Sequence, residues 1–510
     1  MNLSRRGFLG ALGLTALGAS SLGALVLPSS AGSTGQLLRS AARLPEPFAV
    51  SLPIPPVAEP VRADATGDYY RIVQREAEVE ILPGLRTPML TYGGVFPGPT
   101  VISRRGRRTV VRHRNELPVP TAVHLHGGHT PADSDGYPTD LVLPAGGWDH
   151  TGHARHGDVE RGVRQYVYPC DQRAATLWYH DHRMDFTGPQ VYRGLAGFHL
   201  VTDEEDDALP LPTGERDVPL MIVDRAFEED GSLRYPSLDP DLRSVPGVEE
   251  DFAEGVLGDV ILVNGAPWPV LDVDAARYRL RVLNASNARR YLLRLEPAAE
   301  LIQVGSDGGL LERPVRQSEL LVAPGERFDL VVDFSRFRPG TELTLRNGLD
   351  TGRTADVMRF RVVRRATDDT EVPAVLSSIE RLDPAQAVRT RQWRFARAHT
   401  GDHHAWLIND APFAAARSDG EVALGEVEIW RFTSDLHHPV HVHLDPFQVV
   451  SRRGKEPGPY DAGWKDTIDI GPADYVDVAV RFTDYPGRYL VHCHNLEHED
   501  MAMMAAFDVR

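Results

Sequence analysis

Three stretches of the chain repeat one pattern, and this repeat constrains the possible fold more than any other feature. In each stretch a short run of alternating apolar and polar residues is followed by a polar turn and a second such run. The first runs are Thr109 to Asn115, Tyr278 to Asn284 and Glu428 to Thr433. Alternating runs between turn residues are typical of strands, and recurrence along a chain indicates a repeated structural unit. The sequence therefore predicts three similar β domains, each a sandwich or a barrel.

The length and the composition agree with several β domains. A chain of 510 residues is too long for one ordinary core, and its 39 prolines and 45 glycines favour strands and turns over helices. Two acidic runs, Asp203 to Asp207 and Ala366 to Glu371, are interpreted as solvated linkers. We therefore expect domains at residues 67–203, 204–365 and 366–510, preceded by a Pro-, Ala- and Ser-rich arm or linker at 32–66.

The N-terminus predicts export. Ser4-Arg5-Arg6-Gly7-Phe8-Leu9 precedes an apolar, Gly-rich run, which is the pattern of a twin-arginine signal peptide at residues 1–31. Cleavage is expected between about Ala24 and Ala31. We therefore expect recognition by the twin-arginine machinery and a secreted, periplasmic or cell-wall-associated protein.

The charge narrows the set of partners. A net charge of −17 argues against nucleic acid and anionic membranes as main partners. Beyond the N-terminal run, no segment is apolar enough to span a bilayer, so no stable membrane association is expected.

The C-terminus holds a dense group of metal-binding side chains. His492-Cys493-His494 is followed by His498 and by three methionines within a few residues. One thiolate and two imidazoles with a long thioether contact form a blue-copper electron-transfer site. A surface histidine cluster beside a core cysteine is the alternative. Because strand side chains alternate faces, His492 and His494 should point away from Cys493, toward a second centre.

Three further His-x-His motifs strengthen the metal interpretation. They occur at His124 to His126, His180 to His182 and His438 to His443. On a strand this spacing places both imidazoles on one face. The motifs are divided between the first and the last domain, whereas the middle repeat carries Arg290 and Leu292, so the middle domain should hold no metal of its own. The sequence thus predicts several copper ions shared by the outer domains.

The second cysteine, Cys170, is interpreted as a free, buried thiol. A disulfide between Cys170 and Cys493 would remove the thiolate that copper needs. Three histidines in a Gly-rich loop, His150, His153 and His156, are more simply a solvated loop than an extra metal site.

These motifs resemble the three-domain multicopper oxidases, in particular bacterial spore-coat laccase, with bilirubin oxidase and phenoxazinone synthase as relatives. The similarity extends from about residue 45 to the C-terminus. It also includes His126 to Pro138, Gly305 to Leu310, Gly463 to Thr467 and His498 to Asp500. The resemblance implies an all-β fold of three consecutive cupredoxin-like Greek-key β-barrel domains.

The resemblance also implies four copper ions and their ligands. Type 1 copper would be held by His438, Cys493 and His498 with Met503 as axial ligand, and Met501 and Met504 are rival axial candidates. The trinuclear cluster would be held by His124 and His441 (type 2), His126, His180 and His494 (one type 3 ion), and His182, His443 and His492 (the other).

By the same resemblance, Asp135 and Glu499 would supply protons to the oxygen site, with hydrogen bonding to ligand histidines as the simpler alternative. The implied reaction is one-electron oxidation of phenolic or aminophenolic donors, docked near an exposed His498, coupled to reduction of O2 to water. Bilirubin or metal-ion (cuprous) oxidation, and a non-catalytic copper carrier, are the alternatives. The chain has eight methionines and no Met-rich insert near the type 1 site, which argues against a cuprous oxidase.

Overall fold

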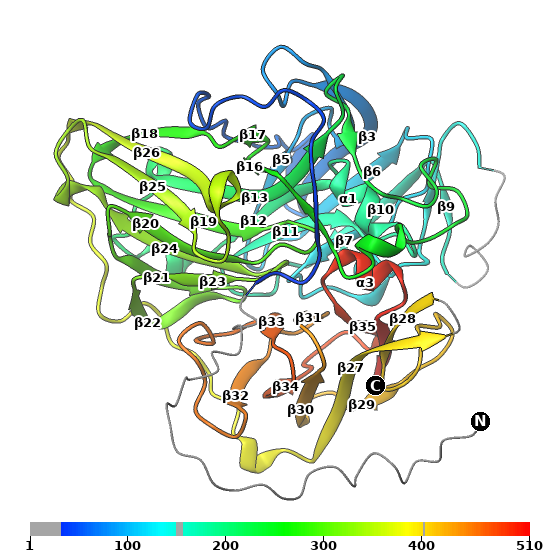
Figure 1. Ribbon diagram of the computed structural model, residues 1–510. Helices are drawn as coiled ribbons and strands as arrows, with labels where there is room; N and C mark the ends of the chain where they lie inside the picture. Colours follow the sequence, from blue (N-terminus) through cyan, green and yellow to red (C-terminus); the bar gives the residue numbers. More distant parts are fainter. Residues whose placement is uncertain (1–31, 149–156, 401–402) are drawn as a thin grey trace, which may run out of the picture. The chain divides into compact units, whose positions relative to one another are not determined.

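The computed structural model describes residues 32–148, 157–400 and 403–510, and in them the all-β prediction is confirmed. In this described part of the chain, six sheets of four to eight strands contain most of the strands, and two two-stranded sheets contain the rest (Figure 1). The twin-arginine segment 1–31 and the loop with His150, His153 and His156 lie outside the described residues.

The first pair of sheets follows the N-terminal arm. One sheet has the order β10-β6-β3-β2 with β4 on β3, formed by β2 (Arg62–Asp64), β3 (Gly67–Val79), β4 (Thr87–Tyr92), β6 (Thr109–Asn115) and β10 (Val163–Tyr168). The other has the order β5-β12-β11-β7, formed by β5 (Gly98–Arg104), β7 (Val123–His126), β11 (Ala175–Asp181) and β12 (Ala196–Thr202).

The second pair lies in the middle of the sequence. Its larger sheet, β17-β16-β13-β19-β24-β21-β22 with β14 on β13, is formed by β13 (Asp217–Phe227), β14 (Leu233–Arg234), β16 (Val260–Val263), β17 (Ala266–Pro267), β19 (Arg277–Asn284), β21 (Leu301–Ser306), β22 (Gly309–Gln317) and β24 (Arg327–Asp333). Its smaller sheet, β18-β26-β25-β20-β23, is formed by β18 (Val270–Ala275), β20 (Tyr291–Glu296), β23 (Leu320–Val322), β25 (Glu342–Asn347) and β26 (Asp356–Arg365).

The third pair contains the C-terminus. The sheet β28-β27-β30-β34-β32 is formed by β27 (Arg389–Thr400), β28 (His403–Ile408), β30 (Val427–Ser434), β32 (Gln448–Arg452) and β34 (Tyr475–Arg481). The sheet β29-β36-β35-β31-β33 is formed by β29 (Gly420–Val422), β31 (His438–Val442), β33 (Thr467–Ile470), β35 (Gly487–Cys493) and β36 (Met504–Val509). Buried aromatic and aliphatic side chains of both sheets form one core between them, as in a β-sandwich.

Among the residues that the structure describes, helices are few and short. They are α1 (Thr187–Tyr192), α2 (Glu204–Asp207) and α3 (Leu496–Asp500), with 3-10 turns at Ala132–Ser134, Gly214–Arg216, Glu250–Phe252, Phe334–Arg336, Gly352–Ala355 and Pro384–Gln386. Within the described part of the chain, none of these helices has the length or the apolar character needed to cross a bilayer. Helix α3 follows β35 directly and lies against α1, so a segment of the third sheet pair contacts the first (Figure 1).

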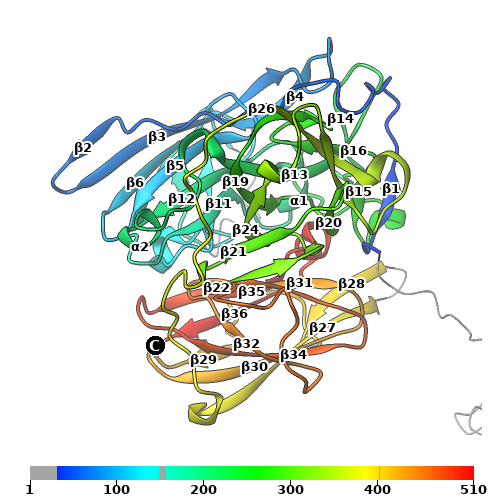
Figure 2. The same ribbon diagram turned by 90° about the vertical axis from the view of Figure 1, so that its left-hand side faces the viewer.

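The arm at 32–66 is integrated into the fold. Strand β1 (Gln36–Leu38) pairs in parallel with β15 (Val256–Gly258), and Figure 2 shows the two side by side. Strand β2 of the arm pairs with β3. The second small sheet pairs β8 (Val142–Leu143) with β9 (Glu160–Arg161).

The acidic runs are solvated only in part: Glu204, Asp207 and Asp369 are exposed, as the linker prediction expects, but other carboxylates of the two runs have partners in the fold. Asp203 is buried and accepts hydrogen bonds from the amides of Ala174 and Asp206, which caps α2. In the second run, Asp368 pairs with Arg277 at 3.3 Å. These two carboxylates stabilise local structure, because folding brings backbone amides and a guanidinium group next to them.

Candidate metal centre

Strand register brings the predicted histidines together. In the first sheet pair, β7 lies beside β11, so that His124 is opposite His180. In the third pair, β31 lies beside β35, so that His441 is opposite His492 and Val440 is opposite Cys493. Because side chains alternate faces along a strand, each His-x-His motif presents two imidazoles to one side.

The thiolate group is formed by His438, Cys493 and His498. The Cys493 Sγ lies 3.4 Å from His438 Nδ1 and 3.5 Å from His498 Nδ1, and the two nitrogens are 3.1 Å apart. Nitrogen ligands about 2.0 Å from a shared transition-metal ion in tetrahedral geometry lie about 3.3 Å from one another. All three side chains are fully buried. The donor spacing therefore fits one small ion.

The surroundings of this group separate the three methionines. Met503 is buried in the same apolar cluster as Cys493, and its backbone hydrogen-bonds to those of Cys493 and His498. Met504 belongs to a different cluster, with Tyr137. Met501 also packs against the cluster of Cys493 but is only partly buried, so the geometry favours Met503 as the thioether beside the group.

The prediction of an exposed His498 is wrong. Its side chain has no exposed surface, and its Nε2 donates to the backbone carbonyl of Glu254 at 3.2 Å. The Trp406 ring stacks on the imidazole with centroids 3.6 Å apart. This cover could not be predicted from local sequence, because Glu254 lies more than 200 residues from His498 along the chain.

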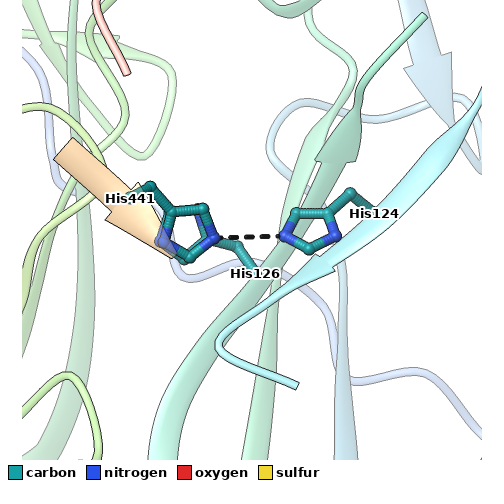
Figure 3. A group of neighbouring side chains, drawn as sticks. All are labelled: His124, His126 and His441. Carbon is teal, nitrogen blue, oxygen red and sulfur yellow. Dashed lines mark hydrogen bonds between the residues drawn. The ribbon is translucent and has the colours of Figure 1, made fainter. Parts of the chain in front are cut away.

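The remaining eight histidines form one continuous cluster. Figure 3 shows His124 and His441, whose Nε2 atoms face each other at 3.4 Å, with His126 stacked on His441. In a second set the Nε2 of His492 lies 3.4 Å from that of His182 and 3.2 Å from that of His443. The third set has ligand-type atoms within 4.8 Å of one another and is formed by His126, His180 and His494.

Several of these imidazoles have buried nitrogens without a hydrogen-bond partner. They include Nδ1 of His126, Nε2 of His180 and both ring nitrogens of His494. A buried polar atom without a partner is unfavourable in a protein interior, so each of these nitrogens indicates a binding partner that the protein chain itself does not supply. Burial holds the pKa of these three histidines well below the ordinary value, which keeps the rings neutral. Neutral imidazole is the form that binds a transition metal.

The two predicted carboxylates, Asp135 and Glu499, contact the Nδ1 atoms of histidines in this cluster. Asp135 Oδ2 lies 2.7 Å from Nδ1 of His443, and the Asp135 backbone carbonyl lies 2.6 Å from Nδ1 of His124. The Glu499 oxygens lie 3.4 Å from Nδ1 of His182 and 3.2 Å from Nδ1 of His492. Burial raises the pKa of both carboxyl groups. Each can therefore orient imidazoles and hold a proton next to the cluster.

One carboxylate that contacts the histidine cluster, Asp466, is not among the predicted site residues. Asp466 Oδ1 lies 3.1 Å from Nε2 of His126, and the Asp466 backbone carbonyl accepts from Nδ1 of His441 at 2.9 Å. Arg327 of β24 donates to the same carboxylate at 2.6 Å. The residue lies in the Gly463 to Thr467 motif, and the resemblance of that motif to the family assigns Asp466 no role.

The middle sheets supply a wall of the centre but none of the clustered ligand-type side chains among the described residues. Gly325 has a φ of +85°, and a Cβ on it would lie 3.1 Å from ring carbons of both His126 and His494. Only glycine accepts this backbone conformation without strain and leaves room for both rings.

Comparison with known proteins agrees with this geometry. Models of the multicopper oxidase family match residues 74–156, 159–206 and 382–510. A laccase of Bacillus stratosphericus is 37% identical, covering 91% of this chain and 99% of that protein. The chain belongs to the multicopper oxidase family. It is accordingly a laccase-like oxidoreductase with copper cofactors.

A second curated protein and a solved structure are also similar to this multicopper oxidase. The bilirubin oxidase of Albifimbria verrucaria is 35% identical, covering 94% of this chain and 85% of that protein. The crystal structure of a multicopper oxidase from Pediococcus acidilactici superposes with a TM-score of 0.80 at 30% identity and covers 93% of each chain.

Cys170, the second cysteine, is buried and free, as predicted.

Proposed function

We propose that this oxidase holds four copper ions in the arrangement that the sequence predicts. His438, Cys493 and His498, with the Met503 thioether beside them, would hold the type 1 ion. The trinuclear cluster is bound by His124 and His441, by His126, His180 and His494, and by His182, His443 and His492. The proposal is supported by the donor spacing and by the unpartnered ring nitrogens described above.

The contiguity of the two centres carries the proposal. Cys493 belongs to one group, and its sequence neighbours His492 and His494 belong to two sets of the other. Copper bound here supplies one-electron uptake from a donor and four-electron reduction of O2. The chain contributes a covalent connection of a few bonds between the centres, and it keeps the imidazoles dry and neutral.

The carboxyl groups of Asp135 and Glu499 serve as proton holders in this proposal. Both are fully buried against ligand histidines, and the pKa of each is raised by burial. A carboxyl with a raised pKa binds its proton more tightly than an ordinary carboxyl, and at this position it could pass that proton toward the oxygen site.

We expect phenols and aminophenols to be the donors, in line with the laccase relatives. A panel of dimethoxyphenol, o-aminophenol, bilirubin and Cu(I) with the copper-loaded enzyme should give the fastest oxygen uptake with the phenolic donors. Faster uptake with bilirubin or Cu(I) would favour the alternative oxidases. No uptake with any donor from a blue, copper-replete protein would instead support a copper carrier.

Export is proposed from the paired arginines and the apolar run that follows them. Residues 1–31 fused to a folded reporter should carry it across the inner membrane of a bacterium, and Arg5→Lys with Arg6→Lys should retain it in the cytoplasm. Export of the double variant at the original rate would contradict a twin-arginine signal.

A further inference from the structure

A short segment that lies between β14 and β16 in the sequence covers the outer side of His498, which we call the type 1 edge. The Glu254 carbonyl accepts from His498 Nε2 at 3.2 Å and from the side-chain amide of Asn495 at 3.1 Å. We call residues 254–258 the strap. A donor cannot reach the His498 ring from this side without displacing the strap.

The strap is tied down from two directions. Below it, the amide of Val256 donates to Glu497 of α3 at 3.1 Å. Above it, β1 of the N-terminal arm pairs with β15, and the amide of Gln36 donates to the Gly255 carbonyl at 2.9 Å. Gly35 lies so close that a Cβ on it would be 2.6 Å from the Gly255 oxygen. The arm therefore clamps the strap onto the type 1 edge.

Three charged side chains form the outer surface at this point. Glu254 makes an ion pair with Arg397 of β27, and the two side chains are 38% and 32% exposed. The backbone amide of Arg397 donates to Asp435 at 2.7 Å, and the other oxygen of Asp435 lies 3.1 Å from Nε2 of His438. We call Glu254, Arg397 and Asp435 the entry patch. Its residues thus contact the outer nitrogen of each type 1 histidine.

We propose that electron donors dock on the entry patch, outside the clamped strap, and that its charges select among donors. This inference rests on the proposed type 1 site. With two carboxylates and one guanidinium, the patch is net acidic, so it favours cationic or amine-bearing aromatic donors over anionic ones. The effect operates mainly on association, because rim charges alter encounter rates.

Two charge variants with two outer-sphere donors test the selection. Glu254→Gln should raise kcat/KM for anionic ferrocyanide and lower it for cationic hexaammineruthenium(II), each by about threefold to tenfold at low salt. Arg397→Gln should do the reverse. Both effects should shrink at high ionic strength, since exposed charges are screened. Arg361→Gln, at an exposed ion pair on β26, is the matched control and should leave both values unchanged.

A third variant tests the clamp. Gly35→Ala places a methyl group against the Gly255 oxygen at a φ of +139°, which strains the contact between β1 and the strap. Hydrogen exchange followed by mass spectrometry should show faster exchange at residues 254–258, and the spectrum of the blue copper should shift as His498 loses its acceptor. Gly146→Ala, where a Cβ meets nothing within 4 Å, is the control and should show neither change.

The outcomes separate the inference from the function on which it rests. A wild-type protein without blue copper would overturn the type 1 assignment itself. A blue Glu254→Gln enzyme whose ratio of the two kcat/KM values equals that of the wild type would overturn the entry patch. Unchanged exchange of the strap in Gly35→Ala would overturn the clamp.

Discussion

Replacing Cys493 with serine is expected to abolish the blue absorbance and to lower donor oxidation by about three orders of magnitude or more, the loss typical when one member of a catalytic unit is removed. Cys493 is fully buried and contacts both His438 and His498 through Sγ. A serine hydroxyl has a similar size but cannot provide the soft thiolate that the site requires. Absorption spectroscopy, copper analysis and oxygen uptake measure the result, and one copper per chain should be missing.

The other cysteine provides the matched control. Cys170 is also buried, and its Sγ lies 3.5 Å from the Tyr168 carbonyl, in the core of the first sheets. Cys170→Ser should therefore keep the blue absorbance and the turnover. Retained donor oxidation in Cys493→Ser, or loss of the blue colour in Cys170→Ser, would contradict the assignment of the type 1 ligand to Cys493.

The second large effect is expected at the buried pair behind the trinuclear histidines. Arg327 is fully buried, and its guanidinium donates to Asp466, which in turn contacts His126. Arg327→Met leaves the Asp466 carboxylate buried without its cation, and such a loss destabilises a protein by about 3–5 kcal/mol. A lower melting temperature and weaker copper retention at His126 are expected, measured by calorimetry and metal analysis.

Two further variants make this prediction specific. Adding Asp466→Asn to Arg327→Met removes the unpaired charge and should recover part of the melting temperature, because the two residues are energetically coupled. Arg361→Met breaks an exposed ion pair with Asp272 and should change nothing measurable. Equal effects at Arg327 and Arg361 would show that the buried pair has no special role.

Much of the centre could be predicted because most of its ligand side chains lie in short motifs whose spacing can be read directly from the sequence. A His-x-His motif on a strand fixes the side to which both rings point, and the spacing of Cys493, His498 and Met503 lies within one β35–α3–β36 segment. The repeat and its turns likewise indicated the all-β class. These features need only the two-residue period of a strand.

The parts that could not be predicted depend on partners far away in sequence. The cover on His498 comes from Glu254, and the support of His126 comes from Arg327 through Asp466. The acidic run at Asp203 has the composition of a linker, yet folding places the Ala174 amide beside it. Nothing in a local window distinguishes a solvated carboxylate from one that meets a partner only in the folded chain.

We expect the two copper centres to act together in reducing O2 to water. This expectation is tested most directly by counting electrons: the copper-replete enzyme is given a limiting amount of a one-electron donor, and O2 consumption and hydrogen peroxide are measured together. We expect one O2 to be consumed for every four donor molecules oxidised, with no peroxide released. One O2 for every two donors, with peroxide accumulating, would contradict it.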